Sequence, residues 1–235
     1  MSDILRKVSK KSIDNEFYSP FPRGYKKGQT KYIIVFGTVI SGLGKGIFGS
    51  SLSKLLQYKG FNIAPIKFDG YLNQDAGTLN PFRHGEVFVL DDGTESDMDL
   101  GTYERFLDKN ITRSNYLTNG MLFQTILDKE RDGKYLGRDV QVIPHVTGEI
   151  KYYLRKLAIK SKSDIVFFEV GGTVGDLENM YCIEAARQLM LRKEKKMFVL
   201  SPLRMFLSRN FLENRKARLP NWELRVYCLW VYSRT

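Results

Sequence analysis

Short runs of consecutive apolar residues alternate along the chain with segments in which apolar residues recur at helical spacing. The runs at 31–37, 61–68 and 163–172 suit strands that are buried on both faces of a parallel sheet. Between the first two runs, residues 47–60 repeat apolar positions at helical spacing and stop at Gly60, a residue typical of helix ends. A strand, a glycine-rich loop, a helix and a second strand in this order predict a βαβ unit and hence an α/β domain.

The same patterns continue to about residue 200. Helices are expected at 102–111, 114–131, 147–160 and 176–192, and strands at 86–90, 140–145 and 197–202. Residues 69–100 otherwise lack a period but contain aromatic side chains, which favours an ordered functional loop over a disordered one. The mostly parallel sheet should therefore carry flanking helices and one long loop.

The ends of the chain differ from its body. Residues 1–30 mix charges with proline and glycine, and we expect a largely irregular extension there. Residues 31–200 should form one domain, because 235 residues of which 43% are apolar can bury one sizeable core. Beyond about residue 203 the chain shows neither a helical nor a strand period, and this part contains both tryptophans.

The net charge of +11 raises the question of a nucleic-acid partner. However, the excess lies at the two ends, with +4 in residues 1–30 and +8 in residues 191–235, while residues 31–190 carry −1. We therefore expect no nucleic-acid partner. No apolar stretch approaches the ~18 residues of a membrane span, and no secretory signal is visible, so we expect no membrane partner and a cytoplasmic location. Cys182 and Cys228 are too few for a disulfide framework.

The strongest local signal is the glycine-rich sequence GTVISGLGKGI, from Gly37 to Ile47, between the first strand and the first helix. Backbone N–H groups and a helix N-terminus at this place predict phosphate binding, with Lys45 reaching the terminal phosphates. Gly46 stands where the usual pattern has the Ser or Thr that binds Mg²⁺. The alternative is a glycine-rich turn with a solvent-exposed lysine.

Carboxylates could supply the missing magnesium ligands. Glu169 follows an apolar strand, and ligands of open α/β sheets bind at the carboxyl ends of strands. Its alternative role is an ion pair with a nearby lysine. A second source is the acidic segment 91–99, where spacing alone does not choose among Asp91, Asp92, Glu95, Asp97 and Asp99.

Five longer motifs occur in the chain: GTVISGLGKGI, KFDGYLNQDAGTLNPFRHGEVFVLDDG, SDMDLGTYERFLD, KERDGKYLGRDVQVIPHVT and FEVGGTVGDLEN. Together, over about residues 31–191, they resemble the N-terminal synthetase (amidoligase) domain of the CTP synthase family. The resemblance implies a P-loop-type α/β fold like that of dethiobiotin synthetase, here incomplete at its C-terminal end.

The resemblance also implies a reaction. ATP phosphorylates the 4-oxygen of UTP, and ammonia displaces the phosphate to give CTP, which is both product and inhibitor. Ammonia comes from glutamine through a separate glutaminase domain. The family assembles as homotetramers with nucleotide sites at subunit interfaces.

Site residues follow from the matching motif positions. In the loop, Ser41 matches a serine that contacts the pyrimidine nucleotide, and Gly42, Leu43, Gly44, Lys45, Gly46 and Ile47 match the ATP phosphate loop. Lys45 and Lys67 match catalytic lysines that neutralise phosphate charge, and Asp99 and Glu169 match the Mg²⁺ ligands. Asp176, Leu177 and Glu178 match the segment that contacts CTP. His84 lies in a matching loop, where we expect a packed or hydrogen-bonded histidine.

The chain departs from the family pattern in three places. Thr38 replaces a glycine of the loop, and Gly70 replaces a proline. Near residue 200 the basic lysine-threonine-lysine-proline-threonine-glutamine segment, which binds the UTP phosphates in the family, is not found. We therefore expect that residues 201–235 are a tail that does not belong to the family and that arose from a frameshift. We also expect that the glutaminase domain is absent and that the synthetase is weak or inactive.

Two other functions remain open from the sequence. One is a different P-loop ATPase or amidoligase, such as a biotin- or cobyrinate-type enzyme. The other is a non-catalytic remnant or interaction module that joins full-length subunits.

Overall fold

The computed structural model describes residues 20–37, 44–173, 175–191 and 197–200. Its centre is a parallel sheet of five strands in the order β5-β2-β6-β1-β7. The strands are β1 (Lys31–Gly37), β2 (Ile63–Asp69), β5 (Tyr116–Thr118), β6 (Ile165–Thr173) and β7 (Met197–Leu200). A separate antiparallel hairpin consists of β3 (Val87–Val89) and β4 (Glu95–Asp97). The α/β class and the parallel sheet are thus confirmed.

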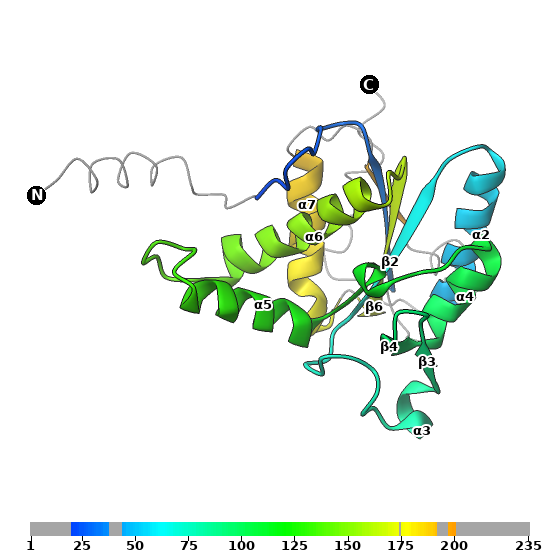
Figure 1. Cartoon of the computed structure of the whole chain (residues 1–235), viewed down its shortest axis with the longest axis horizontal. Helices are drawn as coiled ribbons and strands as arrows, with labels where there is room; N and C mark the ends of the chain where they lie inside the picture. The colour runs from blue at the N-terminus through cyan, green and yellow to red at the C-terminus, as the bar shows by residue number, and fades with distance from the viewer. Residues whose placement is uncertain (1–19, 38–43, 174, 192–196, 201–235) are drawn as a thin grey trace, which may run out of the picture.

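Helices cover both faces of the sheet (Figure 1). They are α2 (Lys45–Tyr58), α3 (Pro81–His84), α4 (Met98–Leu107), α5 (Asn119–Arg131), α6 (Thr147–Lys160) and α7 (Met180–Leu191), with short turns η1 (Arg113–Asn115), η2 (Val142–Val146) and η3 (Leu177–Asn179). Strand β1 explains the division, because Ile33 and Val35 enter one core cluster and Ile34 enters the other. The first cluster packs under α2 and α4, and the second packs under α5, α6 and α7.

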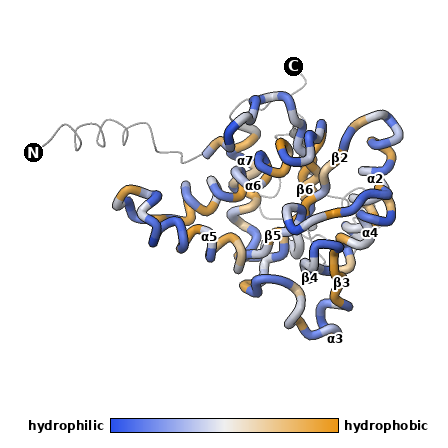
Figure 2. The backbone as a smooth tube through the Cα atoms, viewed as in Figure 1, coloured by the Kyte–Doolittle hydropathy of each residue, from blue (hydrophilic) through white to orange (hydrophobic). Residues whose placement is uncertain are grey.

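Hydropathy follows this layering. The first six residues of β6 are all buried, although one of them is Glu169. Figure 2 shows hydrophobic residues at the centre of the domain and hydrophilic residues around α3. The long segment before α4 therefore lies at the periphery of the domain, as a loop with α3 and the β3–β4 hairpin.

Most predicted elements are present, with shifted boundaries. The helix expected at 102–111 is α4, which begins at Met98 because the Asp97 side chain caps it by accepting from Asp99 N at 3.1 Å. It ends before Asp108, whose φ is +50°. The helix expected at 114–131 begins only at Asn119, since residues 116–118 pair with β2 as a strand.

The strand predicted at 140–145 is wrong. Val142 and Ile143 are about half exposed, and the chain makes the single turn η2 before α6. Pro144, which follows a cis peptide bond, has no N–H group for a strand ladder. The short apolar run therefore did not mark a buried element.

Residues 20–30 form turns without a helix or strand, and they pack on α6. The Arg155 side chain is fully buried, with its guanidinium carbon 4.1 Å from the centre of the Phe21 ring and 5.5 Å from that of Tyr25. Its Nη1 donates to Pro20 O at 3.2 Å. Tyr25 OH and Thr30 Oγ1 add hydrogen bonds to Tyr32 OH and Ser163 O, so several contacts hold this segment on the domain.

Candidate functional site

The candidate site lies at the carboxyl ends of β1, β2 and β6, which together form one edge of the sheet. The parallel register places Lys67 of β2 and Val35 of β1 on either side of Glu169 of β6. The loop to α2 leaves β1 at this same edge, so Lys45 returns to it at the start of the helix. The carboxyl ends of parallel strands are where open α/β sheets bind ligands.

A group of charged side chains lies here, with Lys67 and Glu169 buried and Asp97 and Asp99 partly exposed. Lys67 Nζ lies 3.0 Å from Asp97 Oδ2 and 3.5 Å from Glu169 Oε1, and it contacts Asp99 directly. Burial alone would lower the pKa of Lys67, but the surrounding carboxylates, Glu169 foremost, raise it well above its ordinary value. The lysine is therefore charged, and one cation is shared by three acids.

Glu169 is the most enclosed member of this group. Its side chain is fully buried, and Tyr103 OH donates a hydrogen bond to its Oε2 at 2.8 Å. Burial raises the pKa of Glu169, while the charge of Lys67 opposes the rise. A carboxylate held in this way needs a cation beside it, so both interpretations of Glu169 from the sequence agree with its surroundings: the ion pair exists, and the position suits a metal ligand.

Lys45 approaches from the other side. Its Nζ donates to Gly172 O at 2.9 Å, in the turn after the buried part of β6. Burial, and then repulsion from Lys67, lower the pKa of Lys45. It is therefore not the solvent-exposed lysine of the alternative interpretation.

The start of α2 explains the unusual glycine after Lys45. Gly44 has a φ of +77° and caps the helix without a side-chain hydrogen bond. A Cβ on Gly46 would collide with Asp99 Oδ1, so a larger residue there would displace the Asp99 carboxylate from its present position. The Asp99 carboxylate thus occupies the space in which a Ser or Thr hydroxyl is expected. Ile47, on the same turn, is 64% exposed.

The segment expected to contact CTP lies at the same edge, between β6 and α7. Asp176 Oδ2 accepts from Thr173 N at 2.6 Å, which folds the turn back on the strand. Leu177 and Glu178 are exposed. The structure therefore brings together Lys45, Gly46, Lys67, Asp99, Glu169 and the turn 176–178. Ser41, Gly42 and Leu43 lie outside the described residues.

Several residues of this edge were not predicted from the sequence. Asp97 joins the Lys67 cluster, although spacing had left it open among five acids. Asp69, at the end of β2, accepts hydrogen bonds from Tyr71 OH and Tyr116 OH, both at 3.1 Å. Burial raises the pKa of Asp69 to about 7, against the opposing charge of Lys67. Its signal was a polar residue ending a buried strand, next to Lys67 in the sequence.

The carboxylates at this site are of the ligand type that suits a nucleotide-bound magnesium ion. Within the described ranges no group of three or more His, Cys, Asp or Glu side chains is arranged to hold a metal. Asp99 and Glu169 both contact one cation, Lys67 Nζ, so the two carboxylates face the same part of the site. Mg²⁺ is commonly held by one or two carboxylates, with phosphate oxygens and water as the other ligands.

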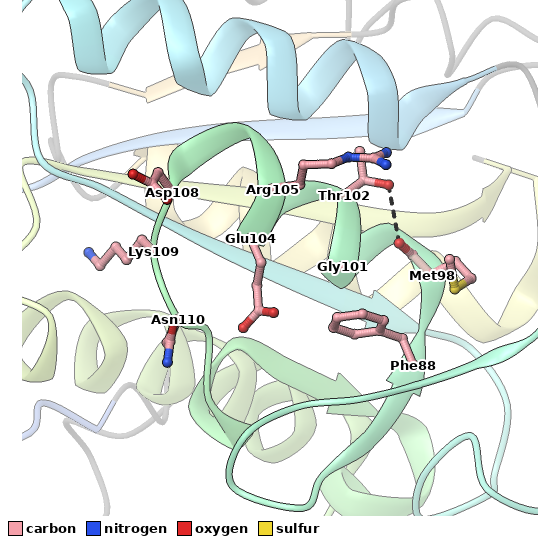
Figure 3. A pocket seen from close by; sticks show the side chains of 9 residues that line it. All are labelled: Phe88, Met98, Gly101, Thr102, Glu104, Arg105, Asp108, Lys109 and Asn110. Carbon is pink, nitrogen blue, oxygen red and sulfur yellow. Dashed lines mark hydrogen bonds between the residues drawn. The ribbon is translucent and has the colours of Figure 1, made fainter.

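A further cavity lies away from this site. It measures about 440 Å³ and lies beside α4 (Figure 3). Its lining combines both charge signs: Phe88, Met98, Gly101, Thr102, Glu104, Arg105, Asp108, Lys109 and Asn110. In Figure 3 the charged groups of Glu104, Arg105 and Lys109 point in different directions and do not converge on one ligand. Neither lysine of the candidate site lines it.

A smaller cavity of about 70 Å³ adjoins the site, between Asp69 and Asp97. His84 also lines it, but its side chain is exposed, with its ring 6.2 Å from that of Tyr71. The expectation of a well-packed loop histidine is therefore met by this one ring contact and not by burial. Cys182 is buried in α7 as a free thiol.

No helix in the described part of the chain is both long enough and apolar enough to cross a membrane. The fold and the site together define an α/β domain of the P-loop type, with the glycine-rich sequence after β1 and acidic groups at the ends of β2 and β6. Residues 31–219 match the family model described as CTP synthase N-terminus. The chain belongs to the CTP synthase family.

Individual relatives agree with this family. The CTP synthase of Methanococcoides burtonii is 57% identical over 164 residues, which is 70% of this chain and 30% of the relative. That of Pyrococcus horikoshii is 55% identical over 164 residues, with the same two shares. That of Archaeoglobus fulgidus is 51% identical over 170 residues, 72% of this chain and 32% of the relative. The matching part of this chain therefore spans about a third of the length of these relatives.

Proposed function

We propose that this domain is the synthetase part of a CTP synthase, a ligase that forms a C–N bond in pyrimidine nucleotide biosynthesis. The reaction is the ATP-dependent amination of UTP to CTP through 4-phosphoryl-UTP. The observation that carries the proposal is the group of Lys67, Asp97, Asp99 and Glu169 against Gly46 of α2. The identity to proteins named CTP synthase supports it.

Phosphoryl transfer depends mainly on positioning and on neutralising the charge of the transferred group. In this proposal Gly42–Ile47 hold the ATP phosphates at the N-terminus of α2, and Lys45 leaves Gly172 O to bind them. Lys67 neutralises charge at the 4-oxygen of UTP. Asp99 and Glu169 would hold Mg²⁺, which when bound offsets phosphate charge. No side-chain nucleophile is needed, so the buried Cys182 has no part in the reaction.

The pyrimidine nucleotide, UTP or CTP, would lie along Asp176, Leu177 and Glu178, with Ser41 completing its contacts. Ammonia derived from glutamine enters from a glutaminase domain, as the resemblance implies. The resemblance implies a homotetramer. A cytoplasmic location and the division into an extension (1–30), a synthetase domain (31–200) and a tail (201–235) are further parts of the proposal, although the family model matches as far as residue 219. Since the basic UTP-phosphate segment of the family is not found in this sequence, we expect little turnover from this chain.

Two measurements test the proposal. Mg-ATP should raise the melting temperature of the chain. Lys45→Ala should remove that effect, because in this proposal the lysine binds the ATP phosphates. An ammonia-dependent assay of UTP conversion measures turnover directly. Equal protection by Mg-ATP in Lys45→Ala would refute the loop assignment, and robust turnover would refute the expected weakness.

A further inference from the structure

Asn119, the first residue of α5, joins three segments at the edge of the sheet. Its Nδ2 donates to Gly70 O at 2.6 Å, directly after β2, and reaches Glu178 O in η3 at 3.3 Å. The side chain is buried, with 1% exposure of the residue. One amide group therefore links the strand that carries Lys67 to the turn that carries Glu178.

The neighbours of Asn119 hold the same loop. Thr118 Oγ1 donates to Asn73 O at 2.7 Å while it also caps α5 by accepting from Met121 N. A Cβ on Gly120 would lie 2.6 Å from Asn73 O, so the backbone of the loop passes directly over this glycine. The start of α5 thus fixes residues 70–74 and not Gly70 alone.

A second amide lies on the other side of Gly70. Asn179 Nδ2 donates to Gly171 O at 2.7 Å, and its Oδ1 lies 3.0 Å from the place that a Cβ of Gly70 would take. Glu178 Cβ is equally near that place, also at 3.0 Å. Glycine at position 70, where the family pattern has proline, therefore leaves the room into which η3 packs.

The two amides are not optimised for stability. Asn119 Oδ1 and Asn179 Oδ1 are buried and have no hydrogen-bond partner among the described residues. A buried acceptor without a donor lowers stability, and native structures keep few of them. Two such acceptors lie around Gly70, next to the candidate site. We interpret them as residues kept for holding the neighbouring segments in place and not for stability.

We infer that Asn119, together with Asn179 and Gly70, is a positioning residue for the pyrimidine-nucleotide half of the site. It fixes the turn 176–178 relative to Lys67 at the end of β2. This inference rests on the proposed function. The ATP half is built on β1 and α2, beyond β6 in the sheet order, and Asn119 makes no hydrogen bond to either element within the described residues. Loss of Asn119 should therefore affect the two nucleotides differently.

The test compares Asn119→Ala with a matched variant, Asn115→Ala. Asn115 is also a buried amide, and its Nδ2 donates to Pro65 O of β2 at 2.6 Å. Pro65 lies in the first half of β2, away from the end of the strand that carries the site. Calorimetry with CTP and with Mg-ATP separates the two halves of the site. We expect Asn119→Ala to bind CTP at least about tenfold more weakly and Mg-ATP within about twofold of the unaltered chain. Asn115→Ala should leave both affinities nearly unchanged.

Hydrogen exchange supplies a readout that does not depend on nucleotide. Amides of 70–74 and 171–178 should exchange about tenfold faster in Asn119→Ala and at the original rate in Asn115→Ala. If Asn119→Ala does not fold, Asn179→Ala replaces it. It removes the donor to Gly171 O and should weaken CTP binding selectively.

Equal weakening of both nucleotides, unchanged CTP affinity, or unchanged exchange in these segments would each overturn the inference. An unaltered chain that binds Mg-ATP but not CTP would instead overturn the pyrimidine part of the proposed function. In that case the exchange rates still decide whether Asn119 fixes the turn.

Discussion

Two regions of this domain bury charged side chains, and they do so in different ways. At the edge of the sheet, Lys67 is the cation for three carboxylates. On α6, Glu149 is paired one to one with Lys129, both of its oxygens accepting at 2.6 and 2.7 Å, and Arg155 stacks on aromatic rings. The first region has an excess of negative charge, whereas the second has none. Burial of charge alone therefore does not mark a site; several acids around one lysine do.

The largest effect should come from removing the shared cation. Lys67→Met leaves Asp97, Asp99 and Glu169 without it, and we expect a loss of about 3–5 kcal/mol in the free energy of unfolding. Millimolar Mg²⁺ should restore part of the loss, because the ion replaces the missing positive charge. Urea denaturation with and without Mg²⁺ measures both effects. A loss that Mg²⁺ does not change would show that these carboxylates do not hold the ion.

Substitutions among the buried charges of α6 should change the free energy of unfolding by the same amount with and without Mg²⁺. Arg155→Met keeps the aliphatic bulk of the side chain but loses the stacking on Phe21 and the bond to Pro20 O. We expect a loss of about 2 kcal/mol, equal with and without Mg²⁺. The same urea titrations serve as the measurement. A magnesium-dependent loss in this variant would remove the contrast between the two regions.

A third effect concerns pH and Asp69, beside the Lys67 cluster. Its pKa rises from 3.8 to about 7 on burial, so between these two values the folded state holds a proton that the unfolded state has released. Stability should therefore fall as pH rises through this window, by at most about 1.4 kcal/mol per pH unit from this group. Above pH 7 the dependence ends. Asp69→Asn should flatten the curve between pH 5 and 7, measured by urea denaturation at each pH. A parallel curve in the variant would mean that Asp69 is ionised throughout.

Much of the fold was accessible from the sequence, because long apolar runs and helical periods report burial directly. Strands β1, β2, β6 and β7 were found in this way. The failures are short elements. Residues 140–145 looked like a strand but are half exposed around Pro144, and β5 was hidden in a predicted helix. Three or four residues do not establish a period, so tertiary pairing decided their structure.

The residues of the candidate site also fall into those indicated by local sequence pattern and those that only the folded structure brought together. The glycine loop, Lys45 and Glu169 were indicated by local pattern, since each lies directly beside a strong strand. The choice of Asp99 among five acids came from resemblance, and the parts played by Asp97, Asp69 and Asn119 appeared only in three dimensions. These three come from separate segments that only the folded sheet brings to one edge.

The sequence by itself determined the α/β class, the βαβ unit and the place of the glycine-rich loop, because these depend on periodicity and on glycines at neighbouring positions. Only the tertiary structure decided which acids share Lys67 and that Asp99 lies against Gly46. The physical reason is distance along the chain. Contacts between Lys67 and Glu169 span a hundred residues, and no local pattern encodes them.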